Sequence, residues 1–267
     1  MAKGDFDGYV VVVTGASTGL GRAICVEVAS RGAKAVVINY ARSEAEAHET
    51  AGLVRQEGAE AIVVQGDVSI DEDCKRIAAA AASFSRIDVL FNNAGMTKMA
   101  LDHSDMDAVD AEDFQRLYAV NVIGSFQMTR AAKSLLEAGP KAGAVVMTAS
   151  IAGVMGLGSS TPYCASKGAM ITMTIDLARA LAPKIRVNAI CPGFIATPWF
   201  EKGLGPQAME QMRQRQMKVT PLQVASEAED IAGAAVFLGS PASRHITGET
   251  LLVDGGAHLG GASLGMR

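Results

Sequence analysis

Residues 9–23 read Tyr-Val-Val-Val-Val-Thr-Gly-Ala-Ser-Thr-Gly-Leu-Gly-Arg-Ala, and this stretch decides the fold. A run of β-branched residues such as Val10 to Val13 predicts a short strand that is buried on both faces. The residues that follow Gly21 have helical character. A strand, a glycine-rich turn and the start of a helix, in that order, predict a dinucleotide-binding unit.

The glycines of this turn are spaced Gly-x-x-x-Gly-x-Gly. Glycine lets backbone N–H groups approach a pyrophosphate, and the N-terminus of the next helix adds a favourable dipole. An ordinary glycine-rich loop is the alternative, although the flanking strand and helix argue against it. No Gly-Lys-Ser/Thr sequence ends the turn, which excludes a P-loop. The residues expected to bind the phosphates are Gly15, Ser17, Thr18, Gly19, Leu20 and Gly21.

A second motif, Tyr-Cys-Ala-Ser-Lys at residues 163–167, places Tyr163 and Lys167 on one face of a predicted helix. A tyrosine acts as an acid or base near neutral pH only if its pKa falls from about 10 to about 7, which requires roughly 4 kcal/mol. One lysine charge at ~4 Å supplies about that much at an effective dielectric constant of ~20. The alternative is a surface Tyr and Lys that merely share a helix face.

Together the two motifs resemble the short-chain dehydrogenase/reductase family over about residues 8–256. Three further segments carry the resemblance. Residues 92–95, Asn-Asn-Ala-Gly, follow a strand-like segment; Ser150 precedes Tyr163 by 13 positions; and residues 192–197 read Pro-Gly-Phe-Ile-Ala-Thr. One departure is Ala149, where the family often has a second serine, and it leaves Ser150 in place.

The resemblance implies a catalytic set of Asn121, Ser150, Tyr163 and Lys167. In the implied reaction, Tyr163 gives the substrate oxygen its proton and Ser150 hydrogen-bonds the developing alkoxide. Lys167 holds the nicotinamide ribose and lowers the pKa of the phenol. Asn121 positions a water that relays the proton outward.

The resemblance also implies a cofactor site at several loops. Asp67 is expected to hydrogen-bond the adenine, with Val68 beside it, while a helix cap is the alternative for Asp67. The other expected contacts lie after the fourth strand, after the sixth strand and on the catalytic helix. They are Asn93, Ala94, Gly95, Tyr163, Lys167, Pro192, Gly193, Ile195 and Thr197.

Cofactor choice is expected just after the second strand, where NAD-selective proteins place a carboxylate on the ribose 2′-OH. This chain has Tyr40, Arg42 and Ser43 there, and no acid before Glu44. Arg42 and Ser43 can donate hydrogen bonds to a 2′-phosphate. The sequence therefore favours NADP(H), with NAD(H) as the alternative if Arg42 is simply a solvated charge at the start of a helix.

The substrate is expected to be a small carbonyl or alcohol. The resemblance is closest to 3-oxoacyl-carrier-protein reductases and to glucose and cyclic-alcohol dehydrogenases. Met155, Trp199 and Phe200 suggest an apolar pocket, which favours a ketone or acyl substrate over a sugar. An acyl carrier protein is acidic and would need basic residues at the mouth. The candidates are Lys141, Lys184, Lys202, Arg213, Arg215 and Lys218.

The whole chain of 267 residues is expected to form one α/β domain, a Rossmann-type doubly wound sheet of about seven parallel strands with helices on both faces. A substrate lid is expected at 194–222, with an ordinary helical connection as the alternative, and a glycine-rich tail at 255–267. Strands are predicted near 9–14, 35–40, 60–65, 87–92, 143–150, 185–191 and 249–254. Helices are predicted near 20–31, 43–57, 71–84, 110–137, 163–182 and 227–239.

Bulk composition limits the partners. The net charge of −4 gives no electrostatic reason to expect nucleic acid. The first five residues lack the apolar stretch of a signal peptide, and neither a membrane span nor a metal site is expected, so the predicted location is the cytoplasm. The apolar arc of the helix at 163–182 and the family resemblance predict a homotetramer or a homodimer. A cofactor-binding sensor without turnover remains the alternative to an enzyme, since a fold alone does not separate the two.

Overall fold

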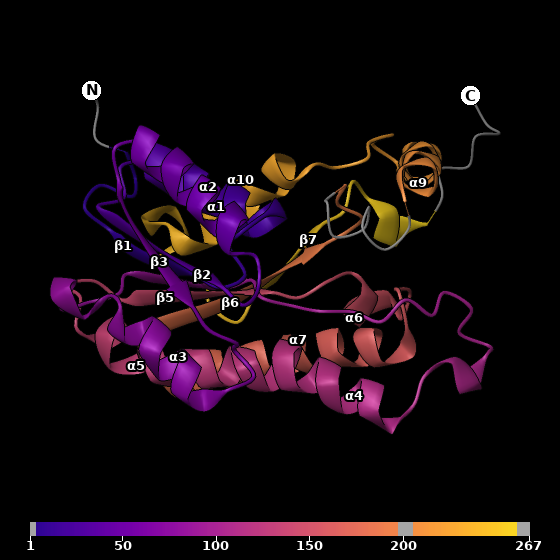
Figure 1. The fold of residues 1–267 in the computed structure, drawn as a ribbon, viewed down its shortest axis with the longest axis horizontal. Coiled ribbons are helices and arrows are strands. Elements are labelled where there is room, and N and C mark those ends of the chain that lie inside the picture. Colours follow the sequence, from indigo (N-terminus) through magenta and orange to yellow (C-terminus); the bar gives the residue numbers. More distant parts are fainter. Residues whose placement is uncertain (1–3, 197–204, 261–267) are drawn as a thin grey trace.

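Seven parallel strands form a central sheet in the order β3-β2-β1-β4-β5-β6-β7 (Figure 1). The computed structural model describes residues 4–196 and 205–260. From β1 the chain builds outward to β3 and then returns to the other side of β1, so the strand order reverses between β1 and β4, where such sheets bind ligands. The strands are β1 (Val10–Val13), β2 (Ala35–Tyr40), β3 (Glu60–Gln65), β4 (Val89–Asn92), β5 (Gly143–Thr148), β6 (Ile185–Pro192) and β7 (Thr250–Val253).

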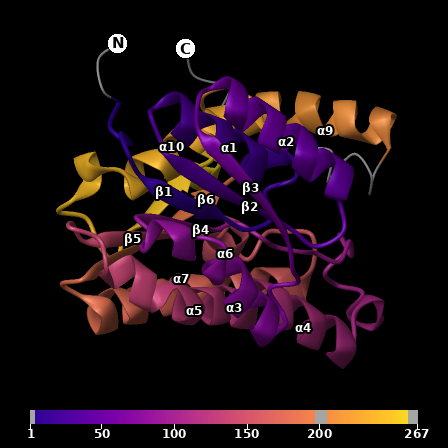
Figure 2. The same ribbon diagram turned by 60° about the vertical axis from the view of Figure 1, so that its left-hand side comes forward.

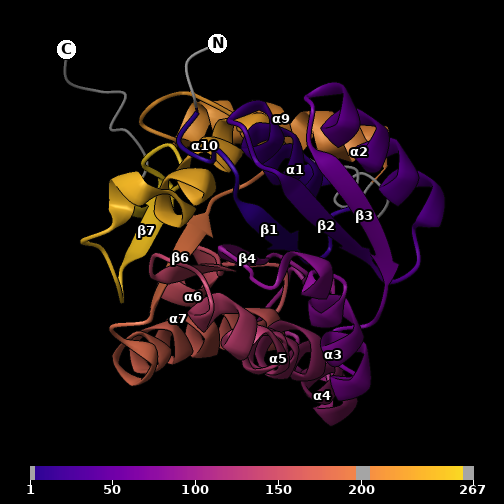
Figure 3. The same ribbon diagram turned by 90° about the vertical axis from the view of Figure 1, so that its left-hand side faces the viewer.

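Helices cover both faces of the sheet, as Figures 2 and 3 show from two sides. On one face lie α1 (Gly19–Ser30), α2 (Glu44–Gln56) and α10 (Ala228–Gly239). On the other lie α3 (Asp71–Ala79), α5 (Ser125–Glu137) and α7 (Thr161–Leu181), with α4 (Ala111–Tyr118) against α7. Two further helices are α6 (Ala152–Met155) and α9 (Pro206–Val219).

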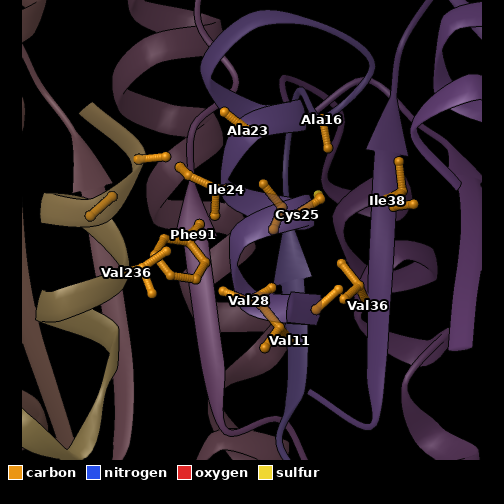
Figure 4. Packing of buried hydrophobic residues seen from close by; sticks show 14 of the residues in the cluster. Val11, Ala16, Ala23, Ile24, Cys25, Val28, Val36, Ile38, Phe91 and Val236 are labelled. Carbon is orange, nitrogen blue, oxygen red and sulfur yellow. The ribbon is translucent and has the colours of Figure 1, made fainter. Parts of the chain in front are cut away.

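The valine run of β1 divides its side chains between two cores. Val11 and Val13 pack under α1 and α10, whereas Val10 and Val12 pack on the opposite side with α3, α5 and α7. Figure 4 shows the first core, where Val28 of α1 lies beside Val11 and Ile24 lies beside Phe91. Each valine of the run is at most 1% exposed. Since full burial of a valine side chain stabilises by about 1.5 kcal/mol or more, both faces of this strand contribute to stability.

The predicted fold class is confirmed, and each of the seven strands lies within two residues of its predicted bounds. The helix predicted at 110–137 is present as an unbroken helical stretch, but it is not one regular α-helix. The chain there forms α4, a π-helical segment (Ala119–Gly124) and α5. The helical periodicity of the sequence runs through this region without a proline, so it did not reveal the widened turn. None of the helices in the described residues combines the length and the apolar character needed to cross a membrane.

Candidate active site

The turn between β1 and α1 offers free backbone donors. Thr18 precedes the helix and makes no side-chain cap, and no acidic residue stands in the first turn of α1. By contrast, α2, α3, α4 and α10 each carry acidic residues in their first turn. The N–H groups at the start of α1 therefore lack a negative partner from their own helix, and they fit an anionic pyrophosphate.

The glycines of this turn are required by close packing. Gly15 and Gly19 have φ of +59° and +56°, the left-handed region that favours glycine. A Cβ on Gly15 would lie 2.8 Å from the Cα of Ala94, and a Cβ on Gly21 would lie 2.4 Å from the carbonyl oxygen of Gly15. The turn thus lies directly against the loop that follows β4, which joins two of the expected cofactor segments.

Two buried amides hold the glycine turn in place. The Oδ1 of Asn39, at the end of β2, accepts a hydrogen bond from the N–H of Gly15 at 3.2 Å. The Nδ2 of Asn93 donates to the carbonyl oxygens of Thr14 and Gly15, both at 3.0 Å. The cofactor contact expected of Asn93 stays a prediction, and its side chain binds the turn. Asn39 was missed, although a polar residue inside a buried strand must find partners and could have drawn attention.

Arg22 is a second residue that sequence reasoning missed. Its Nε and Nη2 donate to the carbonyl oxygen of Ser17 at 3.1 and 2.8 Å. The hydroxyl of Thr50, on α2, donates to the same oxygen at 3.0 Å. These donors hold the carbonyl of Ser17 toward α1 and α2. The glycine turn is therefore anchored on the side that faces these two helices.

Asn121 lies in the π-helical segment and is fully buried. Its Oδ1 accepts a hydrogen bond from the N–H of Met96 at 2.8 Å, and its Nδ2 donates to the carbonyl oxygen of Met96 and to the Oγ of Ser166 at 3.1 and 3.0 Å. The side chain therefore ties the loop after β4 to α7. Single π-helical turns often occur at functional sites, where they displace one residue from the regular helix.

Ser150 and Tyr163 meet at the carboxyl end of the sheet. Ser150 follows β5, and its Oγ accepts a hydrogen bond from the N–H of Ala152 at 3.1 Å. Tyr163 lies in the first turn of α7, where Ser160 caps the helix by accepting from the N–H of Tyr163 at 3.4 Å. A hydrogen bond joins the Ser150 and Tyr163 side chains.

Lys167 lies one turn after Tyr163 on the same face of α7, as its spacing predicts. Its Nζ is 5.7 Å from the centre of the Tyr163 ring and donates to the carbonyl oxygen of Thr148 at 2.6 Å. A Cβ on Gly95 would lie 3.6 Å from this Nζ and 3.4 Å from the Oδ1 of Asn121. The four predicted catalytic side chains therefore gather at one edge of the sheet, beside Gly95.

Burial dominates the electrostatics of this group. It raises the pKa of Tyr163 to about 12, and the hydrogen bond from Ser150 lowers that pKa only in part. Burial also lowers the pKa of Lys167 to about 8. Lys167 is not among the causes of the shift at Tyr163, where loss of hydration dominates, so the lowering of the phenol's pKa by this lysine stays a prediction. At neutral pH Tyr163 therefore holds its proton.

The pKa of Lys167 predicts a measurable pH effect on stability. The value falls from 10.5 to about 8 on folding, so between these pH values the unfolded chain binds more protons and stability rises with pH. The free energy of unfolding of the wild type, minus that of Lys167→Met, should rise by up to about 1.4 kcal/mol per pH unit over that range. Urea unfolding at several pH values measures it. A difference that stays constant with pH would contradict the assignment.

The expected adenine and ribose contacts lie at the ends of β2 and β3. The Oδ1 of Asp67 accepts hydrogen bonds from the N–H and the Oγ of Ser69 at 2.9 and 2.7 Å. Asp67 therefore shapes its own loop, and α3 begins only after Ile70. Val68 is buried against Gly124. The side chain of Tyr40 hydrogen-bonds to Glu44, in the first turn of α2.

The segment after β6 reaches the expected lid. A Cβ on Gly193 would lie 2.9 Å from the Cβ of Asp254, so the ends of β6 and β7 are in close contact. Ile195 forms an isolated bridge with Ser226. Within the expected lid the structure describes α9, whereas the predicted contacts Thr197, Trp199 and Phe200 lie outside the described residues.

Several exposed apolar residues lie on the connections that leave the carboxyl ends of β4, β5 and β6. They come from the loop after β4, from α6 and the turn that follows it, and from α9 and the residues after it. Met155 ends α6 and is half-buried. The exposed members are Leu101, Met106, Val154, Leu157, Met217, Val219, Leu222 and Val224.

The prediction that Lys141 and Lys184 lie near the mouth is wrong. Lys141 precedes β5 and Lys184 immediately precedes β6, so both lie at the amino ends of strands. The catalytic group lies at the carboxyl ends, on the opposite edge of the sheet. Of the other basic candidates, Lys202 lies outside the described residues, and Arg213 forms an ion pair with Glu227.

Comparison with known proteins places this geometry in a family. Residues 15–258 match the family model described as enoyl-(acyl carrier protein) reductase. A 3-oxoacyl-[acyl-carrier-protein] reductase from Synechocystis sp. is 38% identical over 92% of this chain and 96% of its own. Glucose 1-dehydrogenase 2 from Bacillus subtilis is 36% identical over 96% of each chain.

A solved structure of a short-chain dehydrogenase/reductase has the same fold as this chain. The short-chain dehydrogenase/reductase SDR:Glucose/ribitol dehydrogenase from Brucella melitensis superimposes with a TM-score of 0.83 at 31% identity, covering 96% of this chain and 98% of its own. Relatives and structure alike match nearly the whole chain. The chain belongs to the short-chain dehydrogenase/reductase family of NAD(P)(H)-binding oxidoreductases.

Proposed function

We propose that this chain is an NADP(H)-dependent oxidoreductase that interconverts a ketone and a secondary alcohol, with Tyr163 as the general acid and base. The observation that carries the proposal is the gathering of Asn121, Ser150, Tyr163 and Lys167 beside Gly95. A sensor that only binds a cofactor has no chemical need for all four groups, and this favours an enzyme.

The cofactor would lie along the carboxyl edge of the sheet. The N–H groups of the glycine turn and of the first turn of α1 would hold the pyrophosphate. Asp67 and Val68 would contact the adenine, and Lys167 the nicotinamide ribose. When bound, the nicotinamide would supply a hydride to the substrate carbon or accept one from it. Ala94, Gly95, Pro192 and Gly193 would line the space around it.

The protein groups would handle the proton. In the direction of reduction, the Tyr163 hydroxyl would donate its proton to the substrate oxygen, and the protonated state that burial favours is the one this step needs. The hydroxyl of Ser150, which bonds the Tyr163 side chain and accepts from the N–H of Ala152, would turn its hydrogen to the same substrate oxygen. Asn121 would position the water of the proton relay, which runs outward in oxidation and inward in reduction.

Preference for NADPH rests on the start of α2. Arg42 is exposed and forms no ion pair among the described residues, and Ser43 makes no side-chain cap. Both can therefore donate to a 2′-phosphate. Glu44, in the first turn of α2, argues the other way, because its carboxylate would repel a phosphate there. Its hydrogen bond with Tyr40 gives that carboxylate a partner of its own.

The substrate class is a small apolar ketone. The exposed apolar residues on the connections that leave the carboxyl ends of β4, β5 and β6, among them Leu157 at 65% and Leu222 at 71% exposure, suit an apolar ligand better than a sugar. An acyl carrier protein is the weaker candidate, since the predicted basic mouth loses Lys141 and Lys184 and Arg213 is paired with Glu227. Residues 194–222 would act as a lid over the substrate, and the enzyme would work in the cytoplasm.

The proposal is tested by NADPH oxidation against an acetoacetyl thioester, an aryl ketone, a cyclic diketone and an aldose. We expect turnover with the aryl ketone or the diketone at a higher kcat/KM than with the aldose. Turnover of the thioester alone would move the assignment to an acyl substrate. Tight NADPH binding without turnover of any member of the panel would favour the sensor.

We also propose self-association through the outer face of α5 and α7. The expected reason is partly wrong, because Met170, Leu177 and Ala178 of α7 are buried against the chain's own sheet. The apolar side chains left exposed on the helical layer are Phe114, Ile123, Phe126 and Ile175. A second copy would cover this face, giving a dimer or a tetramer.

The association predicts a molecular mass by light scattering of at least twice the chain's 27.7 kDa at micromolar concentration. Ile175→Asp should lower that mass, because it places a charge in the buried interface. Leu53→Asp is the matched control, since Leu53 is exposed to nearly the same extent, 38% against 39%, on the opposite face of the sheet. A mass near 27.7 kDa for the wild type would refute the proposal.

A further inference from the structure

A cavity of about 290 Å³ lies at the edge of the sheet opposite the catalytic group. Its wall combines residues next to β1, β4, β5 and β6 with the segment that follows α10. This volume is near the lower end of small-molecule sites, roughly 300–1,000 Å³. The lining residues are Tyr9, Asp88, Lys141, Ala142, Arg186, Gly239, Ser240, Pro241 and Arg244.

The cavity is separate from the proposed active site. Arg186 is the second residue of β6, whereas Cys191, near the other end of the strand, lies close enough to Lys167 for the two charges to interact. Five residues of extended chain separate them, a distance of roughly 17 Å. A ligand in the cavity would therefore not occupy the cofactor or substrate positions.

The wall of the cavity carries uncompensated positive charge. Asp88 is already engaged, because its Oδ2 accepts from the Nε of Arg86 at 3.0 Å and from the N–H of Val10 at 2.8 Å. Lys141 and Arg244 are exposed and have no carboxylate partner among the residues that the structure describes. Other basic residues, such as Arg42 and Arg179, also lack a carboxylate partner among the described residues, but here three cations line one cavity in a chain of net charge −4.

Arg186 is positioned by carbonyl groups alone. Its Nη1 donates to the carbonyl oxygens of Leu238 and Ile246, both at 3.1 Å, and its Nη2 donates to that of Ser240 at 3.3 Å. These contacts cover the negative end of α10, which would otherwise oppose an anion. Because its partners are neutral, the charge of this half-buried guanidinium is not cancelled.

Lys141 and Tyr9 form the side of the cavity. The Nζ of Lys141 lies 5.9 Å from the centre of the Tyr9 ring, so the lysine is held over the ring while its charge remains free. A ring face next to a cation suits a ligand with an aromatic or other flat apolar part attached to an anionic group.

We propose that this cavity binds a small phosphate monoester, with the phosphate between Lys141, Arg186 and Arg244 and the organic part against Tyr9. Three cations around one space match a dianion better than a singly charged carboxylate. Arginine and lysine side chains are the usual protein ligands of phosphate. The site is independent of the redox reaction, and its test does not require turnover.

Calorimetric titration with phenyl phosphate tests the site. We expect saturable binding with a Kd of about 1 mM or tighter. The double variant Lys141→Gln/Arg244→Gln should bind at least tenfold more weakly, which corresponds to about 1.4 kcal/mol. Both side chains are exposed, so the variant keeps the fold. Benzoate, of similar shape but with one charge, should bind more weakly than phenyl phosphate.

A matched control separates this site from general charge attraction. Lys75→Gln/Lys133→Gln removes the same charge from α3 and α5, where both lysines already pair with carboxylates. This variant should bind phenyl phosphate like the wild type. Equal weakening in the two double variants would overturn the proposal, as would unchanged binding in Lys141→Gln/Arg244→Gln. The second result would place the phosphate elsewhere, for example at the glycine turn.

Discussion

Tyr163→Phe should lower turnover by about 10² to 10⁴ while leaving NADPH binding nearly unchanged. The substitution removes only the hydroxyl that would exchange a proton with the substrate oxygen. The ring keeps its place in the first turn of α7, because the Ser160 cap and the packing around the ring do not involve the hydroxyl. Steady-state rates on the best ketone, together with fluorescence titration of NADPH, measure the two effects separately.

Tyr9→Phe is the control for that variant, since it removes a phenol at the opposite edge of the sheet. Its activity should match the wild type. If Tyr163→Phe kept more than roughly a tenth of wild-type activity, a general acid and base role for Tyr163 would be ruled out. Equal loss of NADPH binding and activity would instead indicate that the hydroxyl supports the structure of the site.

The strands could be predicted because the residues of a buried parallel strand leave a direct mark on the sequence. In β1 each valine faces one of two apolar cores, so all four positions must be apolar. The π-helical segment left no such mark. Its widened turn places Asn121 where the side chain hydrogen-bonds to Met96 and Ser166, which are distant in sequence.

The candidate site could be predicted only in part, because some of its properties depend on contacts between residues that are distant in sequence. The spacing of Tyr163 and Lys167 along one helix correctly predicted a shared face. Their pKa values depend on burial, and burial is set by the packing of α6, α7 and the loops around them. Spacing alone therefore suggested that the lysine would dominate, whereas loss of hydration does. Arg22 and Asn39 act through the glycine turn, and no motif marks them.

The direction of a strand also determines at which edge of the sheet a flanking lysine lies. Lys141 and Lys184 stand just before strands, at the ends of the connections that precede them. In a parallel sheet all strand starts share one edge, so such residues lie away from a site built at the strand ends. This rule moves Lys141 from a carrier-protein contact to the wall of the second cavity.

Arg42→Ala should lower the preference for NADPH over NADH by roughly tenfold to a hundredfold. A charge-assisted contact to the 2′-phosphate contributes about 1.5 to 3 kcal/mol, and about 1.4 kcal/mol corresponds to one factor of ten. The value of kcat/KM with NADPH should fall while that with NADH hardly changes. Arg55→Ala, at the other end of α2, is the control and should change neither value.

Glu44→Gln distinguishes two hypotheses for the start of α2, a site for the 2′-phosphate of NADP(H) and a site for the ribose 2′-OH of NAD(H). If Arg42 and Ser43 hold a phosphate there, removing the neighbouring carboxylate should strengthen the preference for NADPH, because it removes a repulsion. If Glu44 instead binds the ribose 2′-OH of NAD, the wild type should prefer NADH and Glu44→Gln should lose that preference. In both cases the ratio of the two kcat/KM values shifts toward NADPH, so the deciding result is which value changes. With one ketone, the value for NADPH should rise in the first case, whereas the value for NADH should fall in the second. A wild-type preference for NADH would therefore overturn the NADP(H) proposal and assign the selectivity to Glu44.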